Sequence, residues 1–179
     1  MKVRDLMHQK VQTVREDDDL ALALQIMGWT GSRHLPVTRD GEVVGVLSQR
    51  DVFSHMAAEK GRESLTDYVG VAMSKPAKVV EPDDDEKKAA EVMVGEKIGC
   101  LPVVDHGSLV GIVTITDLAA EHARGRLGAG LSESAPVATA MTRDPKTAAP
   151  DELLVDAVQR MVQHQVRHLP VVEIGRAHV

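Results

Sequence analysis

The sequence is poor in aromatic residues, in cysteine and in long apolar runs. Aromatic residues make up 2% of the 179 residues, so a hydrophobic core has to be built from aliphatic side chains and methionine. The single cysteine, Cys100, cannot form an internal disulfide. No apolar run approaches the length of a membrane-spanning helix, and residues 1–10 lack the apolar stretch of a signal peptide. These absences indicate a cytoplasmic protein that is not inserted in a membrane.

Basic clusters and catalytic motifs are absent as well. The formal net charge is −6 and no long basic run occurs. Nucleic-acid binding without sequence preference depends on Lys and Arg neutralising phosphates, so it is not expected here. The sequence shows no nucleophile–base pair, no His/Cys metal spacing and no P-loop. We therefore predict that the chain is not an enzyme, and that it holds neither a metal nor a cofactor.

One sequence pattern occurs three times in the chain. Each copy has a Leu-Pro-Val strand, and the three leucines are 66 and then 68 residues apart: Leu35, Leu101 and Leu169. A methionine precedes each leucine by 28 residues: Met7, Met73 and Met141. A fixed period with fixed internal spacing indicates repeated supersecondary units.

Each complete copy predicts a β-α-β-β-α unit, and the fold class is therefore α/β (α+β). A short β-prone segment leads into acidic residues, Asp17–Asp19 and Asp83–Asp85, which are typical N-terminal caps of the helix that follows. Two strands then flank a hairpin turn, at Asp40-Gly41 in the first copy. Gly45 and Gly111 in the return strands are typical of places where another segment approaches closely. The acidic runs are better explained by capping than by a metal site.

The boundaries follow from this pattern. We predict repeat 1 at residues 1–59, repeat 2 at 68–124, a Gly/Ser-rich linker at 125–134 and an incomplete repeat 3 at 135–179. One unit of this size buries too little apolar area to be comfortably stable alone. We therefore expect repeats 1 and 2 to form a pseudo-two-fold pair, with Leu35 and Leu101 in cores that touch.

The third copy matches the other two up to Val172 and then lacks a return strand and a last helix. The final six residues, Ile174–Val179, resemble the translation of a common sequencing-library adapter. We expect that these six residues are not native and that the natural protein is longer. The alternative is a degenerate third repeat that docks on the first pair.

The recurring parts together resemble the cystathionine-β-synthase (CBS) domain. The first three parts are a methionine followed by Ser or Thr, an acidic-capped helix and the strand Leu-Pro-Val-Val. The fourth part is a single motif that reads glycine, two apolar residues, Ser or Thr, any two residues, and Asp. Two such units in tandem resemble a Bateman module. The resemblance implies that an adenosine-type ligand (AMP, ADP, ATP or S-adenosylmethionine) binds in clefts between the units and regulates an attached or partner protein. It also implies a homodimer. The alternative is a protein-interaction module with vestigial ligand sites.

The resemblance also implies which residues bind the ligand. A carboxylate can accept hydrogen bonds from both ribose hydroxyls, and the ribose set is Asp117, Thr114, Asp51 and Ser48. The adenine would lie near Val11, Thr13, Ala77, Val79, Leu35 and Leu101. Candidate phosphate contacts are Arg33, His34 and Arg50, with Lys78 or Lys97 in the second half. The alternative for the two aspartates is that they only cap helices.

The first copy departs from the pattern at two places. His8 stands where the other copies have Ser74 and Thr142, and its strand reads Pro-Val-Thr instead of Pro-Val-Val. On sequence alone these departures count against the first site, so Thr114 and Asp117 are the favoured ribose contacts.

Overall fold

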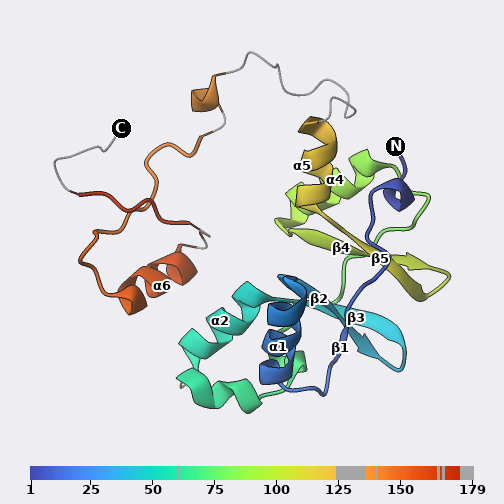
Figure 1. Ribbon diagram of the computed structural model, residues 1–179, viewed down its shortest axis with the longest axis horizontal. Helices are drawn as coiled ribbons and strands as arrows, with labels where there is room; N and C mark the ends of the chain where they lie inside the picture. Colours follow the sequence, from blue (N-terminus) through green and yellow to red (C-terminus); the bar gives the residue numbers. More distant parts are fainter. Residues whose placement is uncertain (60, 124–135, 140, 165, 167, 174–179) are drawn as a thin grey trace. The chain divides into compact units, whose positions relative to one another are not determined.

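The computed structural model describes residues 1–59, 61–123, 136–139, 141–164, 166 and 168–173 (Figure 1). The chain forms two compact units, Met1–Gly128 and Ala129–Val179. The strands are β1 (Val14–Arg15), β2 (His34–Arg39), β3 (Glu42–Ser48), β4 (Cys100–Asp105) and β5 (Ser108–Thr114). The α-helices are α1 (Leu20–Thr30), α2 (Gln49–Ala58), α3 (Val69–Ala72), α4 (Glu86–Glu96), α5 (Ile115–Ala123) and α6 (Leu154–Gln163). Three short 3₁₀ helices lie at Val3–Asp5, Gly61–Thr66 and Val137–Thr139.

The acidic runs begin the helices as predicted. Asp19 accepts a hydrogen bond from the backbone N–H of Leu22 at 2.6 Å, and Asp85 accepts one from Lys87 at 2.9 Å. These bonds satisfy N–H groups that have no partner inside the first helical turn. The bond from the Lys87 N–H lowers the pKa of Asp85, because it stabilises the ionised carboxylate.

The two complete repeats have equivalent sheets. Strand β2 pairs antiparallel with β3, and β4 with β5, through hairpin turns whose two central residues have positive φ: Asp40 and Gly41, and His106 and Gly107. This backbone matches the twist of the flanking strands. The first strand of each repeat is short, as the sequence predicts. It is Val14–Arg15 beside β2 in repeat 1 and a single parallel bridge from Val80 to Val103 in repeat 2.

The opening segment of each repeat pairs with the return strand of the other repeat. His8 forms an antiparallel bridge with Ile112 in β5, and Ser74 forms the equivalent bridge with Val46 in β3. Each bridge is made by two backbone hydrogen bonds of 2.9–3.1 Å. The two repeats are thus joined by reciprocal exchange of their opening segments.

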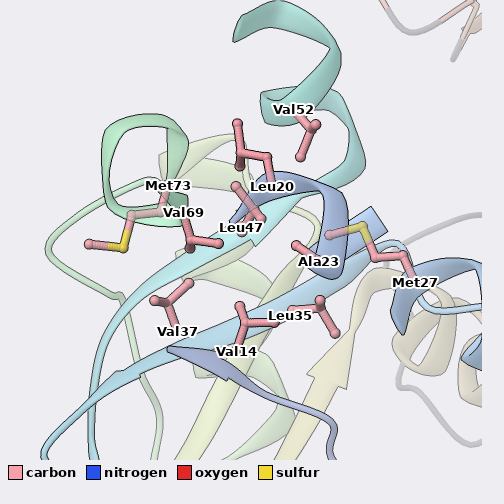
Figure 2. Packing of buried hydrophobic residues seen from close by; sticks show 10 residues of the cluster. All are labelled: Val14, Leu20, Ala23, Met27, Leu35, Val37, Leu47, Val52, Val69 and Met73. Carbon is pink, nitrogen blue, oxygen red and sulfur yellow. The ribbon is translucent and has the colours of Figure 1, made fainter. Parts of the chain in front are cut away.

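This exchange completes two separate hydrophobic cores. Figure 2 shows Val69 and Met73, from the opening segment of repeat 2, packed with Leu35 and Leu47 of repeat 1. Val3 likewise lies in the core around Leu101 and is fully buried. The predicted pairing of the repeats is confirmed, but the predicted contact between the cores of Leu35 and Leu101 is not seen. Each core is closed by an exchanged segment and not by the other core.

Glycine is required where the exchanged segments cross the return strands. A Cβ at Gly45 would lie 2.6 Å from Met73 Sδ and 2.9 Å from the Ser74 carbonyl oxygen. A Cβ at Gly111 would lie 2.6 Å from Met7 Sδ and 3.1 Å from the His8 carbonyl oxygen. The close approach predicted at both glycines is therefore confirmed, and a bridging backbone is what approaches.

We expect Gly45→Ala to destabilise the repeat pair by about 1–3 kcal/mol, because the new methyl group overpacks a backbone that is held by two hydrogen bonds. Gly28→Ala is the matched control. Gly28 lies in α1 with no atom within 4 Å of an added Cβ. Alanine there should raise the free energy of unfolding by about 0.5–1 kcal/mol. Urea denaturation of both variants measures the difference, and equal effects would contradict the crossing described above.

The third repeat begins like the other two, but the valine of its opening segment is exposed. Its first and second strands meet in a parallel bridge between Ala148 and Val171, as Val80 and Val103 do in repeat 2. Val137 stands where Val3 and Val69 stand in the complete repeats. Those two valines are fully buried, whereas Val137 is 82% exposed. The predicted linker (125–134) and the predicted non-native end (174–179) lie outside the described residues, and the predicted domain boundaries stay predictions.

Candidate ligand-binding site

The first candidate site, which we name the Ser48 corner, consists of Ser48 and Asp51 where β3 passes into α2. Asp51 Oδ2 accepts hydrogen bonds from the Ser48 backbone N–H at 2.8 Å and from its hydroxyl at 2.7 Å. The Ser48 hydroxyl accepts in turn from the Asp51 N–H at 3.2 Å. This reciprocal capping box fixes the orientation of the carboxylate. Oδ1 has no partner among the described residues and remains available to another donor.

The Thr114 corner, which consists of Thr114 and Asp117 at the start of α5, repeats this geometry. Asp117 Oδ2 accepts from the Thr114 N–H at 2.8 Å and from the Thr114 hydroxyl at 2.7 Å. The helix-capping role considered for the two aspartates is therefore confirmed. It engages one carboxylate oxygen in each corner, so it leaves the prediction of a ribose contact open for the other oxygen.

The two corners differ at that second oxygen. His8 Nε2 lies 2.9 Å from Asp117 Oδ1, so the ring contacts the atom that is unengaged in Asp51. Ser74 holds the equivalent position beside β3, but its side chain forms no hydrogen bond with Asp51 in the described structure. The sequence counted His8 against the first repeat's site. The structure instead places it at the carboxylate of the second repeat, because the opening segments are exchanged.

The backbones of the three predicted phosphate contacts lie beside the Ser48 corner. His34 is the cross-strand partner of Ser48, and the Arg33 carbonyl accepts the backbone N–H of Gln49 at 2.9 Å. Arg33 and Arg50 are both exposed. Two arginines close to a carboxylate suit a ligand that carries a phosphate group.

The Thr114 corner has no cation at the equivalent strand positions. Gly99 and Cys100 occupy the places of Arg33 and His34. Of the two lysines suggested for this half, Lys78 pairs with Glu96 at 3.0 Å, and Lys97 ends α4 in the left-handed conformation. The positive charge predicted for a phosphate is therefore concentrated at the Ser48 corner.

The residues predicted to line an adenine cleft fall into two groups. Leu35 and Leu101 are fully buried, so their side chains belong to the cores and not to an open surface. The other four reach solvent in part or largely, with Val79 44% exposed: Val11, Thr13, Ala77 and Val79. An adenine contact by these four stays a prediction.

Comparison with known proteins identifies the repeats. The family model of the CBS domain matches three segments of the chain, residues 3–58, 66–123 and 137–177. The chain belongs to the CBS domain family. The predicted resemblance and the repeated CBS-pair fold are thereby confirmed. The ranges of the family model begin each of the first two repeats at the segment that is exchanged in the structure.

Two curated relatives illustrate the range of the match. The CBS domain-containing protein YhcV of Bacillus subtilis is 35% identical over 102 residues, which are 56% of this chain and 69% of YhcV. The uncharacterized protein MJ1225 of Methanocaldococcus jannaschii is 27% identical over 180 residues. That match takes in 96% of this chain but only 63% of MJ1225, so this chain spans less than two thirds of that relative.

Solved structures agree in fold. The crystal structure of MJ1225, proposed as an archaeal homologue of g-AMPK, has a TM-score of 0.83 at 25% identity and covers 98% of this chain and 67% of its own. The CBS domain pair of MJ0100, in complex with 5′-methylthioadenosine and S-adenosyl-L-methionine, has a TM-score of 0.63 at 23% identity. It covers 70% of this chain and 98% of its own. At that identity the likeness to MJ0100 is one of fold.

The third CBS repeat contains a cavity of about 460 Å³. Its walls include neither corner; they are formed by Thr142, Asp144, Pro145, Lys146, His164, Val166 and His168.

Within the described residues no group of three or more His, Cys, Asp or Glu side chains is placed to hold a metal ion. No helix in the described part of the chain is long and apolar enough to cross a membrane.

Proposed function

We propose that this chain is a regulatory module that binds an adenosine-type ligand (AMP, ADP, ATP or S-adenosylmethionine) and thereby controls a partner or attached protein. The observation that carries the proposal is the Ser48 corner. There a capping box orients a carboxylate and leaves Asp51 Oδ1 without a partner among the described residues. The backbones of Arg33, His34 and Arg50 lie beside this corner. A ribose diol supplies two neighbouring donors for such a carboxylate, and a phosphate suits the cations.

The family supports the same ligand class. MJ0100 was solved with two adenosine derivatives, and MJ1225 is proposed as a homologue of g-AMPK. Both names describe those proteins, and we extend the ligand class to this chain as part of the proposal. The role that follows is binding and regulation without catalysis, with homodimerisation as a further part of the proposal.

A thermal-shift panel of AMP, ADP, ATP and S-adenosylmethionine tests the proposal. A ligand at 100 times its dissociation constant stabilises the folded protein by about 2.7 kcal/mol, so at least one of the four should raise the melting temperature clearly. The matched control for AMP is 2′,3′-dideoxyadenosine 5′-monophosphate, which lacks only the diol and should bind much more weakly than AMP. If none of the compounds shifts the melting temperature, the interaction module with vestigial sites is the better explanation.

A further inference from the structure

We infer that His8 closes the Thr114 corner to a ligand, and that the Ser48 corner is the one that takes the ribose diol. This inference rests on the proposed function and adds which of the two corners is occupied and why. The same three hydrogen bonds form in both corners, and two of them hold the carboxylate. The corners differ in the side chain that the exchanged opening segment brings to the second oxygen.

The position of the His8 ring is set by its backbone. The His8 N–H donates to the Ile112 carbonyl at 2.9 Å, and the Ile112 N–H donates to the His8 carbonyl at 3.0 Å. These two bonds hold His8 against Ile112 in β5, three residues before α5 begins at Ile115. From this fixed backbone position, the imidazole Nε2 lies 2.9 Å from Asp117 Oδ1.

Ser74 provides the internal comparison. Its backbone makes the same two bonds with Val46 in β3, at 2.9 and 3.1 Å. The serine side chain is shorter than histidine by several atoms and leaves Asp51 Oδ1 without a partner in the described structure. The two exchanged segments thus differ at one equivalent position. His8 is long enough to contact the carboxylate of Asp117, whereas Ser74 is too short to contact that of Asp51.

The exposure of His8 and the burial of Asp117 favour a role in which the histidine competes with a ligand for the carboxylate, over a purely structural contact. The His8 side chain is 67% exposed, whereas Asp117 is 18% exposed. A ligand that approaches the carboxylate from solvent therefore meets the histidine ring first. Asp117 Oδ2 already accepts two hydrogen bonds, and the ring occupies one of the two acceptor positions of Oδ1. A ligand therefore has to displace the ring before both ribose hydroxyls can donate to Oδ1.

Exchange of the two residues tests this inference. We would measure AMP binding to the full chain by equilibrium dialysis for wild type, His8→Ser, Ser74→His and the double variant. His8→Ser should add one AMP site, weaker than that of wild type because the Thr114 corner has no cation at the equivalent strand positions. Ser74→His should weaken the existing site about tenfold or more, by engaging Asp51 Oδ1. The double variant should bind as many AMP molecules as wild type, with the site moved to the Thr114 corner.

The outcomes separate this inference from the proposed function. If His8→Ser binds AMP as wild type does or more weakly, the histidine does not close the corner, and the inference fails while the proposed function stands. If neither wild type nor any variant binds AMP, ADP, ATP or S-adenosylmethionine, both fail together. Thermal melting of each variant provides the folding control, and His8→Ser should melt close to wild type because its ring is mostly exposed.

Discussion

Val3→Asp should unfold the second CBS repeat. Val3 comes from the opening segment of the first repeat, yet it is fully buried in the core around Leu101, and its N–H donates to the Asp84 carbonyl at 2.9 Å. An unpaired carboxylate in that core should lower the free energy of unfolding by about 3–5 kcal/mol. This loss is comparable with the whole stability of many small domains.

Hydrogen exchange followed by mass spectrometry would locate this effect. Peptides from residues 80–123 should lose protection in Val3→Asp, while peptides from 20–59 should change less, because Val69 and Met73 still close the first core. Val137→Asp is the matched control, since it makes the same substitution at the equivalent position of the third repeat, where the valine is 82% exposed. If Val3→Asp melts as wild type does, the exchange of opening segments is wrong.

Asp51→Asn should weaken AMP binding about 10- to 150-fold, because a hydrogen bond to a charged group contributes about 1.5–3 kcal/mol. The asparagine carbonyl can replace Oδ2 as the acceptor for Ser48, so the cap is kept. The free oxygen becomes an amide NH₂, which cannot accept a hydrogen bond from a ribose hydroxyl. Isothermal titration calorimetry measures the change in affinity.

Asp117→Asn is the control for this substitution. It makes the same chemical change in the corner where His8 already engages Oδ1, so AMP affinity should change little. If Asp51→Asn binds AMP as wild type does, Asp51 is only a helix cap. Equal losses of affinity in both variants would show that the two corners are used alike.

The sequence predicted the local structure well because local structure depends on neighbouring residues. The acidic caps, the hairpin turns with positive φ and the close approaches at Gly45 and Gly111 each follow from a few adjacent side chains. The 66-residue period likewise predicted two equivalent sheets. These features need no knowledge of which repeat contacts which.

The contacts between repeats could not be predicted in the same way. Met7 and Met73 each lie at a fixed distance before a strand, and this spacing is the same whether a segment packs on its own repeat or on the other. The sequence therefore placed His8 with the first site, although exchange brings it to Asp117. For the same reason we expected the cores of Leu35 and Leu101 to touch. In the structure each core is instead closed by the opening segment of the other repeat.

The preference between the two corners depends on this correction. On sequence alone the second repeat matches the CBS pattern more closely, which favours Thr114 and Asp117. In the structure the Ser48 corner combines an unengaged carboxylate oxygen with nearby cations. We therefore give Asp51 the role in ribose binding that the pattern alone favoured for Asp117.

A titration of the ¹⁵N-labelled full chain with AMP, followed by ¹H–¹⁵N NMR, tests the central claim most directly. The account predicts that the backbone amide signals of Ser48 and Asp51 shift as AMP is added, while those of Thr114 and Asp117 stay in place. A titration that moves none of these four signals, or that moves only those of Thr114 and Asp117, would contradict the account.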